Sequence, residues 1–257
     1  MAVRLETQDA IGHIVLDRPP ANSYDRAFME ELGAAIESAR SADAIKAIVV
    51  RSASEKFFSA GADVSVFAKS DLDTQNAFVV CANDAMGKFE SMPKVVIAAI
   101  NGHCLGGGLE IALCCDFRIA AEGTYKIGLP EVSLGLLPGT GGTQRLPRLI
   151  GRQKALGMML RGTTLSPLEA REAGIVDELV PAADLQGRAL ALAQEFAAGP
   201  SYARGQIKLA AVQGYGASLQ DGLAIERAAL IRLLGSEDAR EGVRAFVEKR
   251  KPDYKGR

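Results

Sequence analysis

The sequence predicts a layered α/β fold followed by an all-helical region. Short apolar, β-branched runs alternate with helical patterns through the first two thirds of the 257 residues, as is typical of α/β layers. Strand patterns end near residue 182, and the remainder is predicted to form three or four helices. We therefore expect a core of residues 1–195 and a helical region of residues 196–257, which either covers the core or mediates self-association.

The first part of the chain is predicted to contain two strands and two helices. The apolar runs His13–Leu16 and Ile45–Val50 indicate the strands. Apolar residues at helical spacing indicate a helix between them: Met29, Leu32, Ile36 and Ala39. A second helix has this apolar face: Val79, Ala82, Met86 and Phe89. It should end before Pro93, because the residue preceding a proline disfavours helical backbone.

The middle of the chain predicts a buried strand, a glycine turn and another helix. Val95–Ile100 is a continuous apolar run, and a helical pattern extends from about Gly108 to Cys115. The three glycines Gly106–Gly108 therefore lie at a helix N-terminus.

Capping patterns define the remaining elements. Ser166, Pro167 and Glu169 form a capping box with proline at the first helical position, and Gly174 should end that helix. Ile175–Val180 is predicted to be a further strand. Breaks in the helical region are expected at Gly199-Pro200, Gly214–Gly216 and Gly235, with Ser218 and Ser236 as caps.

Composition excludes several classes of protein. A formal net charge of −1 and a pI near 6.2 predict no general attraction to nucleic acid or to anionic membranes. The four cysteines have neither CxxC spacing nor a histidine cluster, so we expect no metal site and no disulfide framework. No apolar run approaches the roughly 18 to 20 residues that span a bilayer. The N-terminus resembles no targeting segment, and we expect a cytoplasmic protein.

The glycine turn suits an anion, because a helix N-terminus presents unpaired N–H groups. That anion is either a stable phosphate or an oxyanion that forms during a reaction. The phosphate interpretation fails: no G-x-x-x-x-G-K-[ST] pattern occurs, Ile111 stands where a G-x-G-x-x-G pattern needs glycine, and Glu110 would repel phosphate. The segment Pro138–Arg145 fails the same tests. Close packing remains the structural alternative for the glycines.

A second turn of small residues strengthens the oxyanion interpretation. The stretch KFFSAGAD, Lys56 to Asp63, follows a predicted strand, and one N–H from each turn would form an oxyanion hole. Glu131 provides a second carboxylate in the loop GLPEVSLGLLPG. Either glutamate alone is more typical of a solvated surface. Together, beside an oxyanion hole, they could activate a water molecule and deliver a proton.

Several blocks of this sequence, in order, resemble the crotonase, or enoyl-CoA hydratase/isomerase, superfamily. They are the residues Ala60–Asp63, GHCLGGGLEIALCCDFRIA, IGLPEVSLGLLPGTGGTQRLPRLIG and the ending AFVEKRKPDYKGR. The resemblance extends from about His13 to the C-terminus. It implies a spiral of ββα units with a C-terminal helical trimerisation region, assembled as a trimer or a dimer of trimers. It also implies an acyl-coenzyme A thioester as substrate, with no further cofactor.

The resemblance also assigns roles by position. The N–H groups of Ala62 and Gly107 would form the oxyanion hole, Glu110 would act mainly as the base, and Glu131 would hold the water and donate a proton. Retention of both glutamates favours hydration of a trans-2-enoyl-CoA. The expected contacts of the coenzyme are Lys56, Ala60, Asp63, Phe246 and Lys249, with Lys249 reaching it from a neighbouring subunit. The segment Val64 to Asn76, including Phe67, should form a mobile wall of the acyl pocket.

Three alternatives remain open from sequence. An isomerase, decarboxylase, dehalogenase or thioester hydrolase of the same superfamily would use the same enolate-stabilising site. A nucleophilic hydrolase would need a histidine, for which His13 and His103 are available, but no serine or cysteine occupies positions 106–110. Cys104 beside His103 is more typical of buried packing. A non-catalytic protein that binds coenzyme A or RNA could use the basic residues Lys249–Lys251, Lys255 and Arg257.

Overall fold

The computed structural model describes residues 1–257 apart from the side chain of Phe67, so the expectation for that side chain lies outside the described residues. Two sheets form the body of the molecule. The larger has the strand order β1 (Val3–Gln8), β2 (Ile11–Leu16), β3 (Ala47–Ser52), β5 (Val95–Ile100), β7 (Phe117–Ala121) and β10 (Glu178–Val180). β1 and β2 pair antiparallel, and the other neighbours are parallel.

The smaller sheet lies at the ends of these βα units. Its order is β4 (Phe57–Ser59), β6 (His103–Leu105), β8 (Ile127–Gly128) and β9 (Thr164–Leu165). β4, β6 and β8 are parallel, whereas β8 and β9 are antiparallel. Because β4, β6 and β8 run in one direction, the loops that follow them emerge at the same edge. These loops carry the two glycine-containing turns and Glu131.

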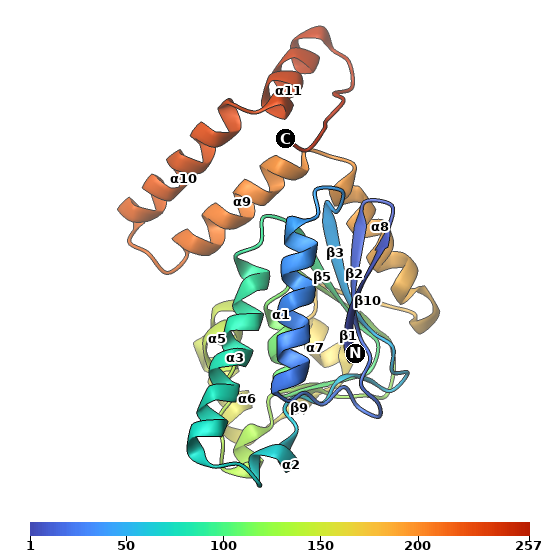
Figure 1. Ribbon diagram of the computed structural model, residues 1–257, viewed down its shortest axis with the longest axis vertical. Helices are drawn as coiled ribbons and strands as arrows, with labels where there is room; N and C mark the ends of the chain where they lie inside the picture. The colour runs from blue at the N-terminus through green and yellow to red at the C-terminus, as the bar shows by residue number, and fades with distance from the viewer.

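Helices cover both faces of the large sheet (Figure 1). On one side lie α1 (Arg26–Ser41) and α3 (Leu72–Glu90), and on the other lies α8 (Leu185–Ala197). All six residues of β5 are buried, which confirms the prediction of a fully covered strand. The shorter helices are α2 (Val64–Phe67), α4 (Gly107–Leu113), α5 (Gly142–Ile150), α6 (Arg152–Arg161) and α7 (Pro167–Glu172), with 3₁₀ turns η1 (Glu131–Leu134) and η2 (Ala182–Asp184).

Three helices extend away from the sheets at the C-terminal end, as Figure 1 shows: α9 (Ser201–Gly214), α10 (Leu219–Leu234) and α11 (Glu237–Glu248). The hydroxyl oxygens of Ser218 and Ser236 accept hydrogen bonds from the third residue of α10 and of α11, so both predicted caps are confirmed. The mixed α/β body and this helical region match the predicted fold class.

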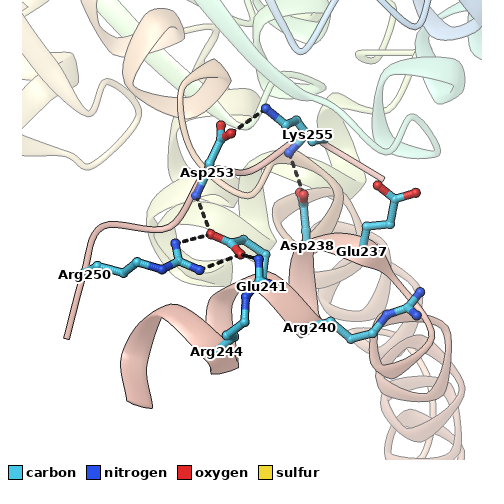
Figure 2. A pocket seen from close by; sticks show the side chains of 8 residues that line it. All are labelled: Glu237, Asp238, Arg240, Glu241, Arg244, Arg250, Asp253 and Lys255. Atoms are coloured by element: carbon cyan, nitrogen blue, oxygen red, sulfur yellow. Dashed lines mark hydrogen bonds and ion pairs between the residues drawn. The ribbon is translucent and has the colours of Figure 1, made fainter. Parts of the chain in front are cut away.

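The C-terminal tail turns back and packs against α11 (Figure 2). Glu241 accepts hydrogen bonds from both terminal nitrogens of Arg250 and from the backbone N–H of Asp253. The buried carboxylate of Asp238 accepts from the N–H groups of Lys255 and Gly256, at 2.6 and 2.8 Å. These bonds use acidic side chains of α11 to hold the basic tail.

Two predicted strands begin later than expected. The strand predicted from Ile45 starts at Ala47, because the N–H of Ile45 donates to the carbonyl of Ala42 and closes a turn. The strand predicted from Ile175 starts at Glu178, because the N–H groups of residues 175 and 176 donate to the carbonyl of Ala170 at the end of α7. In both cases the first apolar residues terminate the preceding segment.

The described residues form neither a membrane-spanning helix nor a cluster of metal ligands. Within them, no helix is both long enough and apolar enough to cross a membrane. No group of three or more His, Cys, Asp or Glu side chains is placed to hold a metal ion in that same part of the molecule.

Candidate active site

The three glycines before Glu110 are required for two reasons, backbone conformation and close packing. Gly106 has a φ of +54°, which disfavours any residue with a Cβ. A Cβ on Gly107 would lie 1.7 Å from the hydroxyl oxygen of Tyr24, and one on Gly108 would lie 2.2 Å from the carbonyl oxygen of Ser59. Close packing, the structural alternative, therefore accounts for two of the glycines, and backbone conformation for the third.

The two small-residue turns lie against each other. A Cβ on Gly61, which has a φ of +87°, would be 2.8 Å from the nitrogen of Gly107. The N–H of Gly107 is the first of α4 and has no acceptor within that helix. Neither Gly107 nor Ala62 donates a backbone hydrogen bond to any other loop, turn or strand of the described chain. Gly61, the neighbour of Ala62, thus lies against Gly107, which is the arrangement that an oxyanion hole formed by the N–H groups of Ala62 and Gly107 would need.

Glu110 lies one turn into α4 and is only 2% exposed. Its Oε1 accepts hydrogen bonds from the N–H groups of Thr140 and Gly142, at 2.8 and 2.7 Å, and its Oε2 accepts from the hydroxyl of Thr140. Hydrogen bonds to a charged acceptor are stronger than those between neutral groups. Three donors from one turn therefore fix the orientation of this carboxylate.

The turn that holds Glu110 is itself held by Arg145. The guanidinium of Arg145 donates to the carbonyl oxygen of Thr140 at 2.9 Å. It also forms a two-pronged ion pair with Glu90 of α3, at 2.9 and 2.6 Å. A bidentate pair restricts the orientation of both side chains. The position of Glu110 consequently depends on α3 and α5 as well as on α4.

Glu131 has a different environment. It begins η1, and its Oε1 would lie 3.1 Å from a Cβ on Gly106, so the carboxyl group sits over the glycine turn. Its Oε2 is buried, yet it has no hydrogen-bond partner among the residues that the structure describes. Burial raises the pKa of Glu131 to about 7, the hydrogen bond from its own N–H opposes this, and the charge of Glu110 adds to it.

Three of the residues expected to bind coenzyme A lie just before β4 or in the turn that follows it, and each has its own contacts. Lys56 is exposed, and its carbonyl oxygen accepts from the N–H of His103. Ala60 donates its N–H to the carbonyl of Ala21. Asp63 caps α2 by accepting from the N–H and the hydroxyl of Ser65, at 3.1 and 2.6 Å. Asp63 therefore has a clear structural role in the turn that contains Ala62.

Phe246 and Lys249 lie far from this site within a single chain. Both belong to the end of α11, which lies at the top of Figure 1, whereas α2, which follows Asp63, lies at the bottom. Phe246 is 85% exposed, and Lys249 has a φ of +54° at the helix C-cap. One chain alone does not bring these residues to the predicted coenzyme site.

Two of the alternatives lose support at this point. Cys104 is fully buried, and burial raises the pKa of its thiol, which disfavours the thiolate form that a nucleophile needs. The basic C-terminal tail is largely neutralised, since Lys255 pairs with Asp253 and Arg257 pairs with Glu237. Arg250 pairs in the same way, with Glu241 and Glu248. These contacts weaken the case for an RNA-binding patch.

Two residues of this site were missed by sequence reasoning. Thr140 supplies two of the three hydrogen bonds to Glu110, although neither the phosphate-loop test of its segment nor the family resemblance assigned it a role. Tyr24 is buried against Gly107 and lies 3.4 Å from the hydroxyl oxygen of Thr140. The segment RPPANSYDRAF contains this tyrosine, but nothing in the segment indicates which residues the side chain contacts.

Comparisons with known proteins gave matches over almost the whole chain. The model of a family described as enoyl-CoA hydratase/isomerase matches residues 6–257. A Rhizobium meliloti protein named probable enoyl-CoA hydratase is 39% identical over 257 residues, covering 98% of this chain and 97% of that protein. The 2,3-dehydroadipyl-CoA hydratase of Escherichia coli is 37% identical over 249 residues, covering 95% and 94%. A crystal structure of a Geobacillus kaustophilus enoyl-CoA hydratase has a TM-score of 0.97 at 42% identity, covering 100% and 97%.

Proposed function

Since this chain belongs to the enoyl-CoA hydratase/isomerase family, we propose that it catalyses the reversible syn-addition of water to a trans-2-enoyl-CoA, giving a 3-hydroxyacyl-CoA. Family membership implies an acyl-CoA thioester as substrate. The observation that carries the proposal is the difference between Glu110 and Glu131. One carboxylate accepts three hydrogen bonds, and the other has a pKa raised to about 7. Such a pair provides a base and an acid at the same pH.

The two glutamates divide the proton transfers of the reaction. Glu110 draws a proton from the water that attacks the β-carbon. Glu131 holds that water with its unpartnered Oε2 and, when protonated, donates a proton to the α-carbon. A positioned acid or base contributes roughly 10²- to 10⁴-fold in rate. Because the two glutamates carry out different proton transfers, loss of either one should lower turnover by about that factor.

The thioester oxygen carries the negative charge that develops between these steps. In this mechanism it accepts hydrogen bonds from the N–H groups of Ala62 and Gly107, which lie in adjoining turns. Fixed donors stabilise an enolate-like oxygen without reorganising, and loss of one donor typically costs about 10²- to 10³-fold in rate. Rigidity of the two glycine turns is therefore part of catalysis.

Coenzyme A recognition is proposed to involve five residues. Lys56 and Lys249 are exposed lysines suited to phosphate groups, and neither has an ion-pair partner among the described residues. Ala60 and Asp63 flank Gly61 and Ala62, which form the turn after β4 and are called the first oxyanion turn. Phe246 is an exposed aromatic residue on α11 that could pack beside the nucleotide. The position of α11 supports the idea that Phe246 and Lys249 serve a neighbouring chain.

The proposal is tested with crotonyl-CoA, whose conjugated thioester absorbance disappears on hydration. We expect rapid loss with the wild type and at least about a 10²-fold lower rate with Glu110→Gln. Glu122→Gln makes the same chemical change at an exposed position and should retain full activity. Near-normal turnover by Glu110→Gln would refute the assignment of the base.

Isomerisation is the second candidate, and the pKa of Glu131 favours it. A carboxyl group that titrates near neutral pH can both remove and return a proton, as transfer between the α- and γ-carbons requires. A 3-enoyl-CoA substrate separates the two activities. If Glu131 catalyses isomerisation without help from Glu110, the Glu110→Gln variant should still convert the 3-enoyl-CoA to the conjugated thioester. The same variant should fail to hydrate crotonyl-CoA.

A further inference from the structure

Tyr24 contacts three parts of the site at once. Its backbone forms a parallel bridge with the first oxyanion turn: its N–H donates to the carbonyl of Gly61, and its carbonyl accepts from the N–H of Asp63, both at 2.9 Å. Its hydroxyl oxygen lies against the Cα of Gly107 in the second turn. The same oxygen is 3.4 Å from Oγ1 of Thr140.

The position of this hydroxyl is well determined. Tyr24 is 1% exposed, and its ring packs against those of Phe28 and Phe78, with centroid distances of 6.1 and 5.9 Å. The hydroxyl of Thr140 donates to Oε2 of Glu110, so its lone pairs remain for the O–H of Tyr24. Burial, and then the charge of Glu110, raise the pKa of Tyr24, which keeps this proton in place. The hydrogen bonds therefore run from Tyr24 through Thr140 to Glu110.

A second buried tyrosine, Tyr125, hydrogen-bonds its hydroxyl to different partners, so the contacts of Tyr24 are not common to every buried tyrosine of this fold. The hydroxyl of Tyr125 donates to the carbonyl oxygens of Ala121 and Ile100, at 2.6 and 3.1 Å. It serves only backbone acceptors outside the site. Tyr24 instead contacts the side chain that orients Glu110. Phenylalanine would fill the same volume without the cost of burying a hydroxyl.

We propose that Tyr24 is a positioning residue, which acts through Thr140 to hold Glu110 in register with the N–H groups of Ala62 and Gly107. This inference rests on the proposed hydratase function. Proton transfer to a base and charge stabilisation at a thioester oxygen must occur in one geometry, and small displacements reduce the rate sharply. One rigid side chain that spans both oxyanion turns and the base network provides such a constraint. Tyr24 itself does not contact the substrate in this scheme.

The first test removes only the hydroxyl. Tyr24→Phe should lower kcat for crotonyl-CoA by about 3- to 10-fold, the equivalent of one hydrogen bond. KM should remain within about twofold, because the hydroxyl makes no substrate contact. Tyr125→Phe removes the same atom from another buried ring, so it should lower stability while leaving kcat unchanged. Equal effects of the two variants on kcat would overturn the inference.

A double-mutant cycle tests whether Tyr24 acts through Thr140. Thr140→Val removes the intermediate hydroxyl, so Tyr24→Phe should then change kcat by less than about twofold. Thr140→Ser keeps the hydroxyl and should retain the sensitivity to Tyr24→Phe. Effects that multiply independently in the Val background would refute the path.

The same cycle is also measured by urea unfolding, which does not depend on activity. Coupling between Tyr24→Phe and Thr140→Val in that measurement is expected whether or not crotonyl-CoA is hydrated. An inactive wild type with this coupling would refute the proposed function alone. An active wild type without coupling in either measurement would refute the role of Tyr24.

Discussion

Glu131 should give the reaction a measurable pH dependence. Its pKa is raised to about 7, chiefly by burial, and hydration requires its protonated form as the proton donor. We therefore expect kcat/KM for crotonyl-CoA hydration to fall as pH rises through about 7. A profile that stays flat from pH 6 to 9 would contradict this role for Glu131.

Glu131 should also make the free energy of unfolding depend on pH, which tests its raised pKa without measuring activity. A carboxyl whose pKa is higher in the folded than in the unfolded protein holds its proton more tightly when folded. The contribution of Glu131 to the free energy of unfolding is greatest below its unfolded pKa of 4.5, and it is lost as pH rises through the folded pKa of about 7. Urea unfolding should thus show Glu131→Gln gaining stability relative to the wild type between pH 5 and pH 8. Glu122→Gln, at an exposed site, should show no such trend.

Local sequence was sufficient to place the two small-residue turns and Glu110, because small residues after a strand and an acid in the first helical turn have direct structural consequences. The resemblance to the family was needed to select Ala62 and Gly107 within those turns. Thr140 could not be placed, since it is 30 residues from Glu110 along the chain and only the packing of α5 against α4 brings the two together. Tyr24 is more distant still, 116 residues from Thr140.

At the scale of elements, the attachment of α9 to the body depends on Lys208. Its buried ammonium group donates to the carbonyls of Phe89 and Lys94, at 2.8 and 3.0 Å, and pairs with Asp116 at 2.8 Å. Lys208→Ala would leave a largely buried carboxylate without its cation. Removal of one partner from a buried pair typically costs about 3 to 5 kcal/mol.

Urea unfolding measures this effect against a matched pair on the surface. Arg26 and Glu30 form an i,i+4 pair with side chains 63% and 56% exposed. Arg26→Ala should therefore lower the free energy of unfolding by no more than about 0.5 kcal/mol. If Lys208→Ala were equally mild, α9 would have to be held to the body mainly by its other contacts, with α8 and β5.

Elements with their own capping signals were predicted best. The capping box at Ser166 is confirmed in full, because both of its hydrogen bonds form within a few residues. The strands β8 and β9 have two residues each, too few to show any periodicity. β8 forms because it pairs in parallel with β6, and β9 forms because it pairs antiparallel with β8. Such strands depend on tertiary structure alone.

At the scale of the whole molecule, the C-terminal helices expose several large apolar side chains. Leu230, Ile231 and Leu234 of α10 are each at least half exposed, and Phe246 of α11 is 85% exposed. Local patterns predicted these helices but could not show what covers them, since any partner lies outside the chain. We expect assembly into a trimer or a dimer of trimers. In that assembly α11 of one chain would reach the site of the next.

Subunit complementation tests this arrangement through Lys249. Glu110→Gln chains lack the base, and Lys249→Ala chains should bind acyl-CoA weakly because they lose a phosphate contact. In oligomers that contain both chains, a site with intact Glu110 can receive an intact Lys249 from its neighbour. Co-expressed chains should therefore regain a low KM for crotonyl-CoA that neither variant shows alone.

The KM of the mixture shows whether Lys249 serves its own chain or a neighbouring chain. If Lys249 served its own chain, every active site in the mixture would lack it, and the KM would stay high however the chains were mixed. A pantetheine thioester lacks the nucleotide, so its KM should be equal for the wild type, Lys249→Ala and the mixture. A KM for this short thioester that rose with Lys249→Ala would instead assign the lysine to the acyl end. Recovery with crotonyl-CoA alone thus requires that Lys249 contact the nucleotide across a subunit boundary, which the position of α11 in Figure 1 favours.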